Sequence, residues 1–493
     1  MDWIVLLPPI VAIGLAMWTR QVYLSLFAGI WLGTTILVGG NPVAGLRELA
    51  DQLVAVFLDA GNTRIIIFSL LVGGLIALVQ VSGGVAGFIA WVQRRGWGQT
   101  RRSAELLAWV VGMLIFVESS ITSLTVGTLS RPFFDRMRLP REKIAYYCDA
   151  TSAPVCMSIP LNGWGAYVLG LLAAQGITAG AVGLLATSLL FNFFSLFAIA
   201  FALLLALTGW GFGPMRRAER RAAETGALVR PDSTPMIAEE VADLRPLRDV
   251  PGQARDLLVP IAVMVGMIFA GLYITGREAL VEEFPNQVPA FGEAMMRGSG
   301  STAVLWAVGL AIGVAMVMYA IPRPLRGGRP VLTLAESTEW VLKGAGGLVA
   351  VVLLLVFAFA LGQVSRALEM GPYIVGLVGE GAPAWWLPAL VFLVGCFVSF
   401  TLGSSWTAFA ILMPIAMPLA EGLGLSLPLM LGAVLSGGVF GDHASPLSDT
   451  SIISSMSAAC DHVDHVNTQM PYALVQAGLA VVAFLAAGLV LGG

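Results

Sequence analysis

Long apolar runs recur along the whole chain, and short polar stretches separate them. A helix needs about 20 predominantly apolar residues to cross roughly 30 Å of hydrocarbon. The runs at residues 3–18, 22–39 and 64–93 approach or exceed this length, and similar runs follow. The pattern therefore predicts an all-α polytopic membrane protein.

One apolar segment, 103–130, is interrupted at its middle by the polar residues 118–123. Each limb has only about 13 residues, or roughly 20 Å of helix, which is too short to span a bilayer. Basic residues flank both ends, and basic loops tend to stay in the cytoplasm. We therefore predict a re-entrant hairpin that opens to the cytoplasm, with its polar tip near mid-membrane. The flanking residues are Arg94, Arg95, Arg101 and Arg102 before it, and Arg131, Arg136, Arg138, Arg141 and Lys143 after it.

The next apolar segment, 143–175, is too long for one straight span. Pro154, Pro160 and Gly163 interrupt it, and these residues break helices. We predict one broken helix, because free backbone groups at membrane depth are tolerated only beside a cavity or packed protein. Its unwound middle would carry Asp149, Thr151, Ser152 and Asn162.

The second half of the chain follows the same plan. Spans at 257–276, 303–321 and 345–378 precede an apolar segment, 385–420, that is interrupted by the sequence GSSWT. A second broken helix is predicted at 427–468. Two local matches keep a nearly constant offset between the halves: Gln80-Val81-Ser82 recurs as Gln363-Val364-Ser365, and Ser119-Ser120 recurs as Ser404-Ser405.

The two halves are predicted to be inverted relative to each other. About five transmembrane helices plus one re-entrant hairpin is an odd number of crossings, so the second copy enters the membrane upside down. Its hairpin is flanked by the acidic Glu380 and Glu421, whereas the first is flanked by basic residues. Inverted repeats whose broken helices meet at the midplane are typical of secondary transporters.

Composition supports this architecture and divides the chain. Hydrophobic residues make up 57% of the 493 residues and charged residues only 12%, against about 25% charged in soluble domains. The one long hydrophilic segment, 209–255, mixes arginines, acids and prolines and is predicted to be a cytoplasmic linker. We thus predict a first transmembrane repeat at 1–208, the linker at 209–255 and a second transmembrane repeat at 256–493.

Candidate chemistry is concentrated at residues 441–465, GDHASPLSDTSIISSMSAACDHVDH. This stretch contains all three histidines and four aspartates, yet no Lys or Arg follows Arg366. A carboxylate without a cationic partner in a low-dielectric interior either takes up a proton or holds a cation. The pattern therefore predicts an ion site. The residues are His443, His462, His465, Asp442, Asp449, Asp461 and Asp464.

Simpler explanations exist for several of these residues. Asp442 and Asp449 could cap helices, although intramembrane carboxylates are functional by default. The cluster at 461–465 resembles a zinc or iron site, but we expect it to lie at the cytoplasmic end of the broken helix, solvated or lining the ion exit. The four scattered cysteines are expected to act as small hydrophobic residues.

Three segments resemble one family. The stretches 119–168, 403–416 (GSSWTAFAILMPIA) and 441–474 are similar to NhaC-type sodium/proton antiporters of the ion transporter superfamily. The resemblance implies Na⁺/H⁺ exchange, and the family also includes exchangers that move organic acids with sodium and protons. Many members carry a pair of aspartates at the first hairpin tip, where this chain has the single acid Glu118.

We therefore expect a secondary active transporter, and not an enzyme, because no GxxxxGKS or GxxxxGKT motif indicates a nucleotide-driven motor. The leading hypothesis is exchange of Na⁺ for H⁺ by competition at buried carboxylates, with Na⁺ at Asp149, Asp442 and Asp449. The alternative is Na⁺- or H⁺-coupled transport of a small carboxylate or amino acid, which helix N-termini could bind.

The predicted partners are Na⁺, H⁺ and the lipid bilayer of a bacterial inner membrane, with no cofactor and no nucleic acid; an organic solute and a homodimer are left open. Ser and Thr hydroxyls, an amide and freed carbonyls would complete an oxygen shell for a hard cation. The predicted binding residues are Glu118, Ser119, Ser120, Asp149, Ser152, Asn162, Ser404, Ser405, Thr407, Asp442, His443, Ser445, Asp449 and Thr450.

Overall fold

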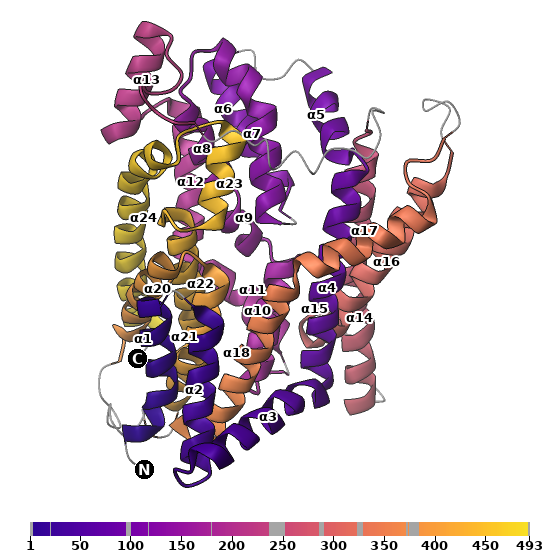
Figure 1. Cartoon of the computed structure of the whole chain (residues 1–493), viewed down its shortest axis with the longest axis vertical. Coiled ribbons are helices and arrows are strands. Elements are labelled where there is room, and N and C mark those ends of the chain that lie inside the picture. The colour runs from indigo at the N-terminus through magenta and orange to yellow at the C-terminus, as the bar shows by residue number, and fades with distance from the viewer. Residues whose placement is uncertain are drawn as a thin grey trace.

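The computed structural model describes residues 3–491 except 20, 95–99, 117, 179, 236–251, 285–289, 323–328, 371–372 and 374–383. Its regular elements are helices, arranged in two groups that run along the long axis of the molecule (Figure 1). Six of the described helices are long and apolar enough to cross a membrane, or up to eight if each of two bent pairs is one span. The prediction of an all-α polytopic membrane protein is confirmed.

Before the linker, the described residues form twelve α-helices. They are α1 (Leu7–Thr19), α2 (Val22–Leu37), α3 (Pro42–Leu58), α4 (Ala60–Val81), α5 (Gly84–Arg94), α6 (Arg101–Leu114), α7 (Ser119–Arg136), α8 (Arg141–Ala150), α9 (Ala153–Ser158), α10 (Gly163–Ala174), α11 (Ala181–Ser188) and α12 (Phe193–Thr208).

From the linker onward the described elements begin with one helix inside the linker. They are α13 (Gly213–Thr225), α14 (Arg255–Glu283), α15 (Phe291–Arg297), α16 (Gly300–Ala320), α17 (Leu334–Gly347), α18 (Val349–Ala367), α20 (Leu387–Leu402), α21 (Ser405–Gly422), α22 (Leu427–Ala444), α23 (Asp449–Ala458) and α24 (His462–Leu491).

Two of the predicted spans have different bounds in the structure. The segment 64–93 is not one helix: α4 ends at Val81 and α5 begins at Gly84. Gly83 takes a left-handed φ of 76°, and the Ser82 hydroxyl donates to the carbonyl of Val79 while accepting from the amide of Gly84. These local bonds end α4 inside an apolar run, and hydropathy does not report them.

Helix α3 is an element that the hydrophobic pattern did not predict. Asn41 accepts hydrogen bonds from the amides of Val43 and Ala44, and Pro42 stands at the first helical position, so the local sequence starts a helix strongly. The chain turns by 114° between α2 and α3. The predicted span 345–378 is also shorter, since α18 covers Val349–Ala367; Glu380, Arg323 and Arg326 lie outside the described residues.

Helices α6 and α7 lie against each other as two limbs of a reversed segment (Figure 1). Arg101 Nε, at the start of α6, donates to the carbonyl of Met137, just after the end of α7, over 3.1 Å. The chain therefore turns back between 115 and 118. Helices α20 and α21 meet at Gly403, which has a φ of 66°. Placement of these tips within the membrane, and the inverted repeat, stay predictions.

The linker helix α13 packs against the ends of α6 and α8 through pairs of charged side chains. Lys143 of α8 is only 2% exposed, and its Nζ lies 2.8 Å from Glu105 of α6 and 2.5 Å from Glu219 of α13. Arg221 of α13 pairs with Glu142 at 2.9 Å. Because a buried ion needs its partners, these pairs fix α13 across the ends of α6 and α8.

Cysteines placed at Arg101 and Arg138 should react with a membrane-impermeant thiol reagent from the same side of the membrane. The bond between Arg101 and Met137 holds these two positions together. The measurement is labelling of sealed vesicles of known orientation, and the four native cysteines, which are all buried, provide the unreactive background. Labelling of the two positions from opposite sides would contradict the hairpin.

Replacing Lys143 with Met should destabilise the protein by about 3–5 kcal/mol, since it leaves the carboxylates of Glu105 and Glu219 buried without a cation. The measurement is the thermal unfolding midpoint in detergent. Adding Glu105→Gln to Lys143→Met should recover part of the loss. A Lys143→Met protein as stable as the wild type would show that α13 is not held by these pairs.

Candidate functional site

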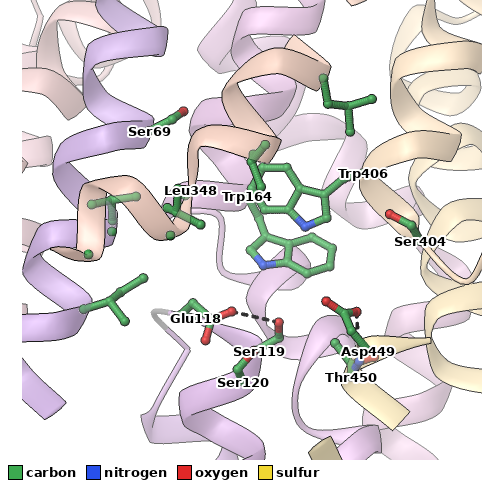
Figure 2. Close-up of a pocket in the computed structure, with 18 of the residues that line it drawn as sticks. Ser69, Glu118, Ser119, Ser120, Trp164, Leu348, Ser404, Trp406, Asp449 and Thr450 are labelled. Carbon is green, nitrogen blue, oxygen red and sulfur yellow. Dashed lines mark hydrogen bonds between the residues drawn. The ribbon is translucent and has the colours of Figure 1, made fainter. Parts of the chain in front are cut away.

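A cavity of about 550 Å³ lies where the two reversed segments meet the second broken helix (Figure 2). Residues from both tips and from α22 and α23 line it, although they are far apart in the sequence. Two indoles, Trp164 and Trp406, lie with ring centroids 5.4 Å apart above the carboxylates. The predicted residues among its lining are Glu118, Ser119, Ser120, Ser404, Thr407, Asp442, Asp449 and Thr450.

Four helices begin at this cavity. Glu118 caps α7 by accepting from the amide of Ile121 at 2.9 Å, and Asn162 caps α10 by accepting from the amide of Trp164 at 2.9 Å. Ser404 caps α21 and Ser448 caps α23. The breaks in the sequence thus place polar caps and the positive ends of helices around one space.

Asp442 carries the most completely bonded carboxylate at the site. Ser448 and Thr450 donate to its Oδ1 at 2.7 and 2.9 Å, and Ser405 donates to its Oδ2 at 2.8 Å. The side chain is 1% exposed, so these hydroxyls replace the water that a carboxylate would otherwise bind. The carboxylate comes from the C-terminal end of α22, and the hydroxyls come from the start of α21 and from the start of α23 with its cap.

Asp449 and Glu118 add two further carboxyl groups to the cavity (Figure 2). The carboxylate of Asp449 is close enough for its charge to act on both Glu118 and Asp442. None of the described residues that line the cavity is Lys, Arg or His. Three acidic groups with no cationic side chain among them create a negative potential that attracts a cation.

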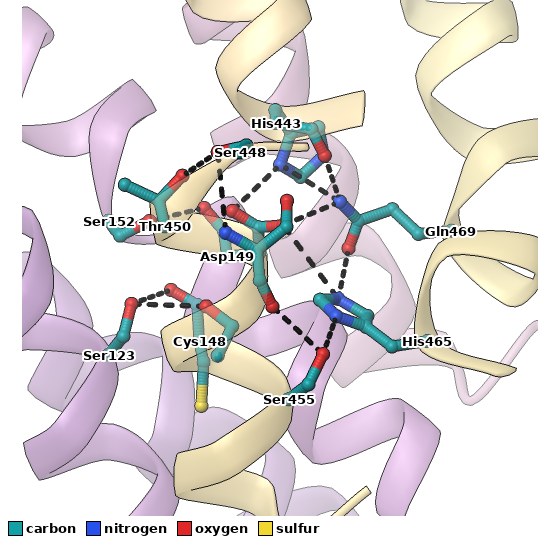
Figure 3. A network of polar contacts seen from close by, with 12 residues as sticks. Ser123, Cys148, Asp149, Ser152, His443, Ser448, Thr450, Ser455, His465 and Gln469 are labelled. Carbon is teal, nitrogen blue, oxygen red and sulfur yellow. Dashed lines mark hydrogen bonds and ion pairs between the residues drawn. The ribbon is translucent and has the colours of Figure 1, made fainter. Parts of the chain in front are cut away.

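Asp149 lies in a second network, next to this cavity but not among its lining residues (Figure 3). Ser451 and Gln469 donate to its Oδ2 at 2.7 and 2.8 Å, whereas Oδ1 has no hydrogen-bond partner. His443 Nδ1 and His465 Nε2 each lie 3.7 Å from the carboxylate. Asp149 is fully buried, so these hydroxyl, amide and imidazole groups take the place of water at its carboxylate.

Three predicted residues hold the breaks and do not line the cavity. The Ser152 hydroxyl donates to the carbonyl of Asp149 at 2.9 Å, and the Ser445 hydroxyl donates to the carbonyl of Phe400 at 2.6 Å. Asn162 donates to the carbonyls of Phe116 and Cys156 while it caps α10. They position the two helix breaks.

Sequence reasoning missed four polar residues of these networks. Ser448, Ser451 and Ser455 come from α23 and the residue before it, and Gln469 comes from the apolar helix α24. The available signal was a polar amide inside a hydrophobic run, because such a group must find a buried partner.

The side chains of the cluster at 461–465 do not form, within the described residues, a group of three or more His, Cys, Asp or Glu that could hold a metal ion. Asp464 pairs with Arg230 at 3.0 Å, and Asp461 accepts from the amide of Thr234 at 2.9 Å. These carboxylates hold the linker, and the expected position of the cluster at the cytoplasmic end stays a prediction.

Together, the polytopic helical fold and the acidic cavity between broken helices define a multi-pass secondary transporter. The chain belongs to the Na⁺/H⁺ antiporter family, whose sequence profile residues 164–489 match. An uncharacterised protein of Haemophilus influenzae is 32% identical over 99% of this chain and 91% of its own length. The arginine/ornithine antiporter ArcD of Halobacterium salinarum is 28% identical over 42% of this chain and 44% of its own length.

A solved structure shares the fold. The YdaH transporter of Alcanivorax borkumensis superposes with a TM-score of 0.56, covering 90% of this chain and 88% of its own, at 14% sequence identity. At this identity the similarity concerns the fold alone. It agrees with an integral membrane protein of the transporter class.

Gly441→Ala should displace Asp442 and lower the stability by about 1–3 kcal/mol. A methyl group at Gly441 would collide with the backbone of α20 at Ser399 and Phe400. Gly478→Ala is the matched control, because nothing lies within 4 Å of its added carbon. The measurement is the thermal midpoint of both variants in detergent, and equal midpoints would contradict the close contact of α20 and α22.

Proposed function

We propose that this protein exchanges Na⁺ for H⁺, with the cation bound in the cavity beside Asp442, Asp449 and Glu118. The observation that carries the proposal is the lining of that cavity: three carboxyl groups and several hydroxyls, with no cationic side chain among the described lining residues. Membership of the Na⁺/H⁺ antiporter family supports it.

Oxygen ligands of the required kind surround Asp442. Na⁺ is a hard cation, and hydroxyl, carbonyl and carboxylate oxygens suit it. Ser405, Ser448 and Thr450 now donate to the carboxylate, and each hydroxyl oxygen keeps lone pairs for a cation. Asp442 thus provides the charge, and its neighbours provide the remaining ligands.

Exchange follows if the proton and Na⁺ compete for the same carboxylates. A buried carboxylate is stable when it is protonated or when it holds a cation, and costly when it is bare. Loading the cavity with Na⁺ therefore releases protons, and protonation expels Na⁺. The opposite gradients of the two ions then drive each other.

We assign Asp149 to the proton side of this cycle. Its carboxylate does not line the cavity, and only one of its two oxygens, Oδ2, accepts hydrogen bonds, from Ser451 and Gln469, in the described part of the chain. Direct binding of Na⁺ by Asp149 stays a prediction. The Ser451 hydroxyl contacts both Asp149 Oδ2 and the carbonyl of Asp442, so the two sites share one side chain.

A second candidate function is coupled exchange of an amino-acid-like solute. The cavity is far larger than one Na⁺ requires, four helix N-termini around it could bind a carboxylate, and the paired indoles offer an apolar wall. The relative ArcD of Halobacterium salinarum is an arginine/ornithine antiporter, and exchange of such amino acids is of this kind.

Asp442→Asn should lower Na⁺-driven proton movement at least about a hundredfold, because an amide keeps the volume but cannot alternate between a proton and a cation. The measurement is the pH change inside proteoliposomes after a Na⁺ jump, with no organic compound present. Asp51→Asn, at an exposed carboxylate of α3, is the matched control and should behave like the wild type.

Two results would contradict the proposal. Wild-type rates in Asp442→Asn would show that Asp442 is not the exchange site. A wild-type protein that is inactive in Na⁺ alone and becomes active when an amino acid or dicarboxylate is added would replace Na⁺/H⁺ exchange by the second candidate.

A further inference from the structure

The polar side chains of Asp149, His465 and Ser455 follow one another in the buried network (Figure 3). Asp149 Oδ2 lies 3.7 Å from His465 Nε2, and His465 Nδ1 lies 2.8 Å from the hydroxyl of Ser455. That hydroxyl lies 2.9 Å from His462 Nδ1. Two imidazoles therefore share one hydroxyl between a buried carboxylate and the surface.

The hydrogens of these groups can be assigned from their partners. Gln469 donates through its amide nitrogen to Asp149 Oδ2 and to the carbonyl of His443, so its oxygen faces His465 Nε2 as an acceptor at 2.9 Å. His465 therefore carries a hydrogen on Nε2. His462 Nε2 faces the carbonyl of Pro446 at 2.9 Å and carries one for the same reason.

Both Nδ1 atoms are then acceptors when the rings are neutral. The Ser455 hydroxyl has one hydrogen, yet three acceptors surround it: the two Nδ1 atoms and the carbonyl of Ser451 at 2.8 Å. A network built only for stability would satisfy its buried acceptors. The network around Ser455 has fewer hydrogens than acceptors, and a proton added to either imidazole ring supplies the missing donor.

We propose that His462, Ser455 and His465 form a proton relay between the linker side of the protein and Asp149, separate from the cation cavity. The relay rests on the proposed function, because it supplies the proton that is exchanged for Na⁺. None of its three residues lines the cavity.

Each transfer conserves the protons. Protonated His462 gives its Nδ1 hydrogen to the Ser455 oxygen while the Ser455 hydrogen moves to His465 Nδ1. His465, now doubly protonated, gives its Nε2 hydrogen to Asp149 Oδ2, the oxygen that it faces, and Asp149 becomes a neutral acid. His465 then carries its hydrogen on Nδ1 and returns to the starting tautomer before the next proton passes. The last gap, 3.7 Å, exceeds a hydrogen bond and closes when the two side chains approach each other.

The outer residue of the relay, His462, lies on the side of the protein where the linker packs. His462 is partly exposed, and the neighbouring Asp461 and Asp464 hold the linker at Thr234 and Arg230. Basic segments stay in the cytoplasm, so the relay opens to the cytoplasm. The other charged or titratable groups near it are Asp149, Glu142 and Arg141 of α8, His443 of α22, Cys460, and Glu219 and Arg221 of α13.

Ser455→Ala should lower Na⁺-driven proton movement roughly a hundredfold in proteoliposomes, as expected when a positioned proton-transfer group is lost. Exchange of ²²Na⁺ for Na⁺ at equal pH on both sides should stay within about twofold of the wild type, since it needs only the cavity. Ser455→Thr, which keeps the hydroxyl, should restore proton movement. Ser454→Ala is the matched control, because that neighbouring hydroxyl bonds Ser123 of α7.

Several outcomes would overturn the relay. Wild-type proton movement in Ser455→Ala would show that the hydroxyl carries no proton. An equal loss of proton movement and Na⁺/Na⁺ exchange would show that Ser455 acts through the cation site or the fold. Failure of Ser455→Thr to restore proton movement, with Na⁺/Na⁺ exchange intact, would also contradict it.

A measurement that needs no Na⁺ distinguishes failure of the relay from failure of the proposed function. Histidine ¹⁵N spectra of the full chain in lipid nanodiscs report the protonation of each ring. The relay predicts that the ring nitrogens of His465 shift together with the titration of His462 in the wild type and not in Ser455→Ala. Independent titration of the two rings in the wild type would overturn the relay even if Na⁺/H⁺ exchange were demonstrated.

Discussion

The structure depends on the cost of burying carboxylates in a membrane protein without cationic partners. Asp442 and Asp149 are almost completely enclosed, and no Lys or Arg follows Arg366 in the sequence. In the described part of the chain, the polar contacts to these carboxylates come from hydroxyls, an amide and imidazoles, and neutral donors compensate a charge less than an ion pair does. A proton or a bound cation compensates such a charge.

The helix breaks make this arrangement possible. A continuous helix would bond its own amides, whereas a break frees them and places a cap at the start of the next segment. Ser404 and Ser448 are such caps: Ser448 itself donates to Asp442, and Ser404 stands beside Ser405, which also does. Because Gly441 has no side chain, α20 can approach α22 closely enough to enclose the adjacent Asp442. Backbone geometry, glycine and hydroxyls together set the position of one carboxylate.

Much of the helical fold and part of the site could be predicted from the sequence, because hydropathy and charge are local signals. Apolar runs identified the membrane helices, and polar residues inside those runs identified the tips at Glu118 and Ser404, which meet at one cavity. Other features depend on contacts between distant segments. The place of Asp149 outside the cavity lining follows from Gln469 and Ser451, which lie about 300 residues away. The break between α4 and α5 depends on the bonds of one serine.

The central claim is that Na⁺ and H⁺ compete for the same carboxylates, and calorimetry of the purified protein tests it most directly. Na⁺ is titrated at one pH into two buffers with different ionisation enthalpies, so that any protons released on binding appear as a difference in heat. The account predicts that Na⁺ binding releases about one proton and that the release is lost in Asp442→Asn. Equal heats in both buffers for the wild-type protein, with Na⁺ bound, would contradict it.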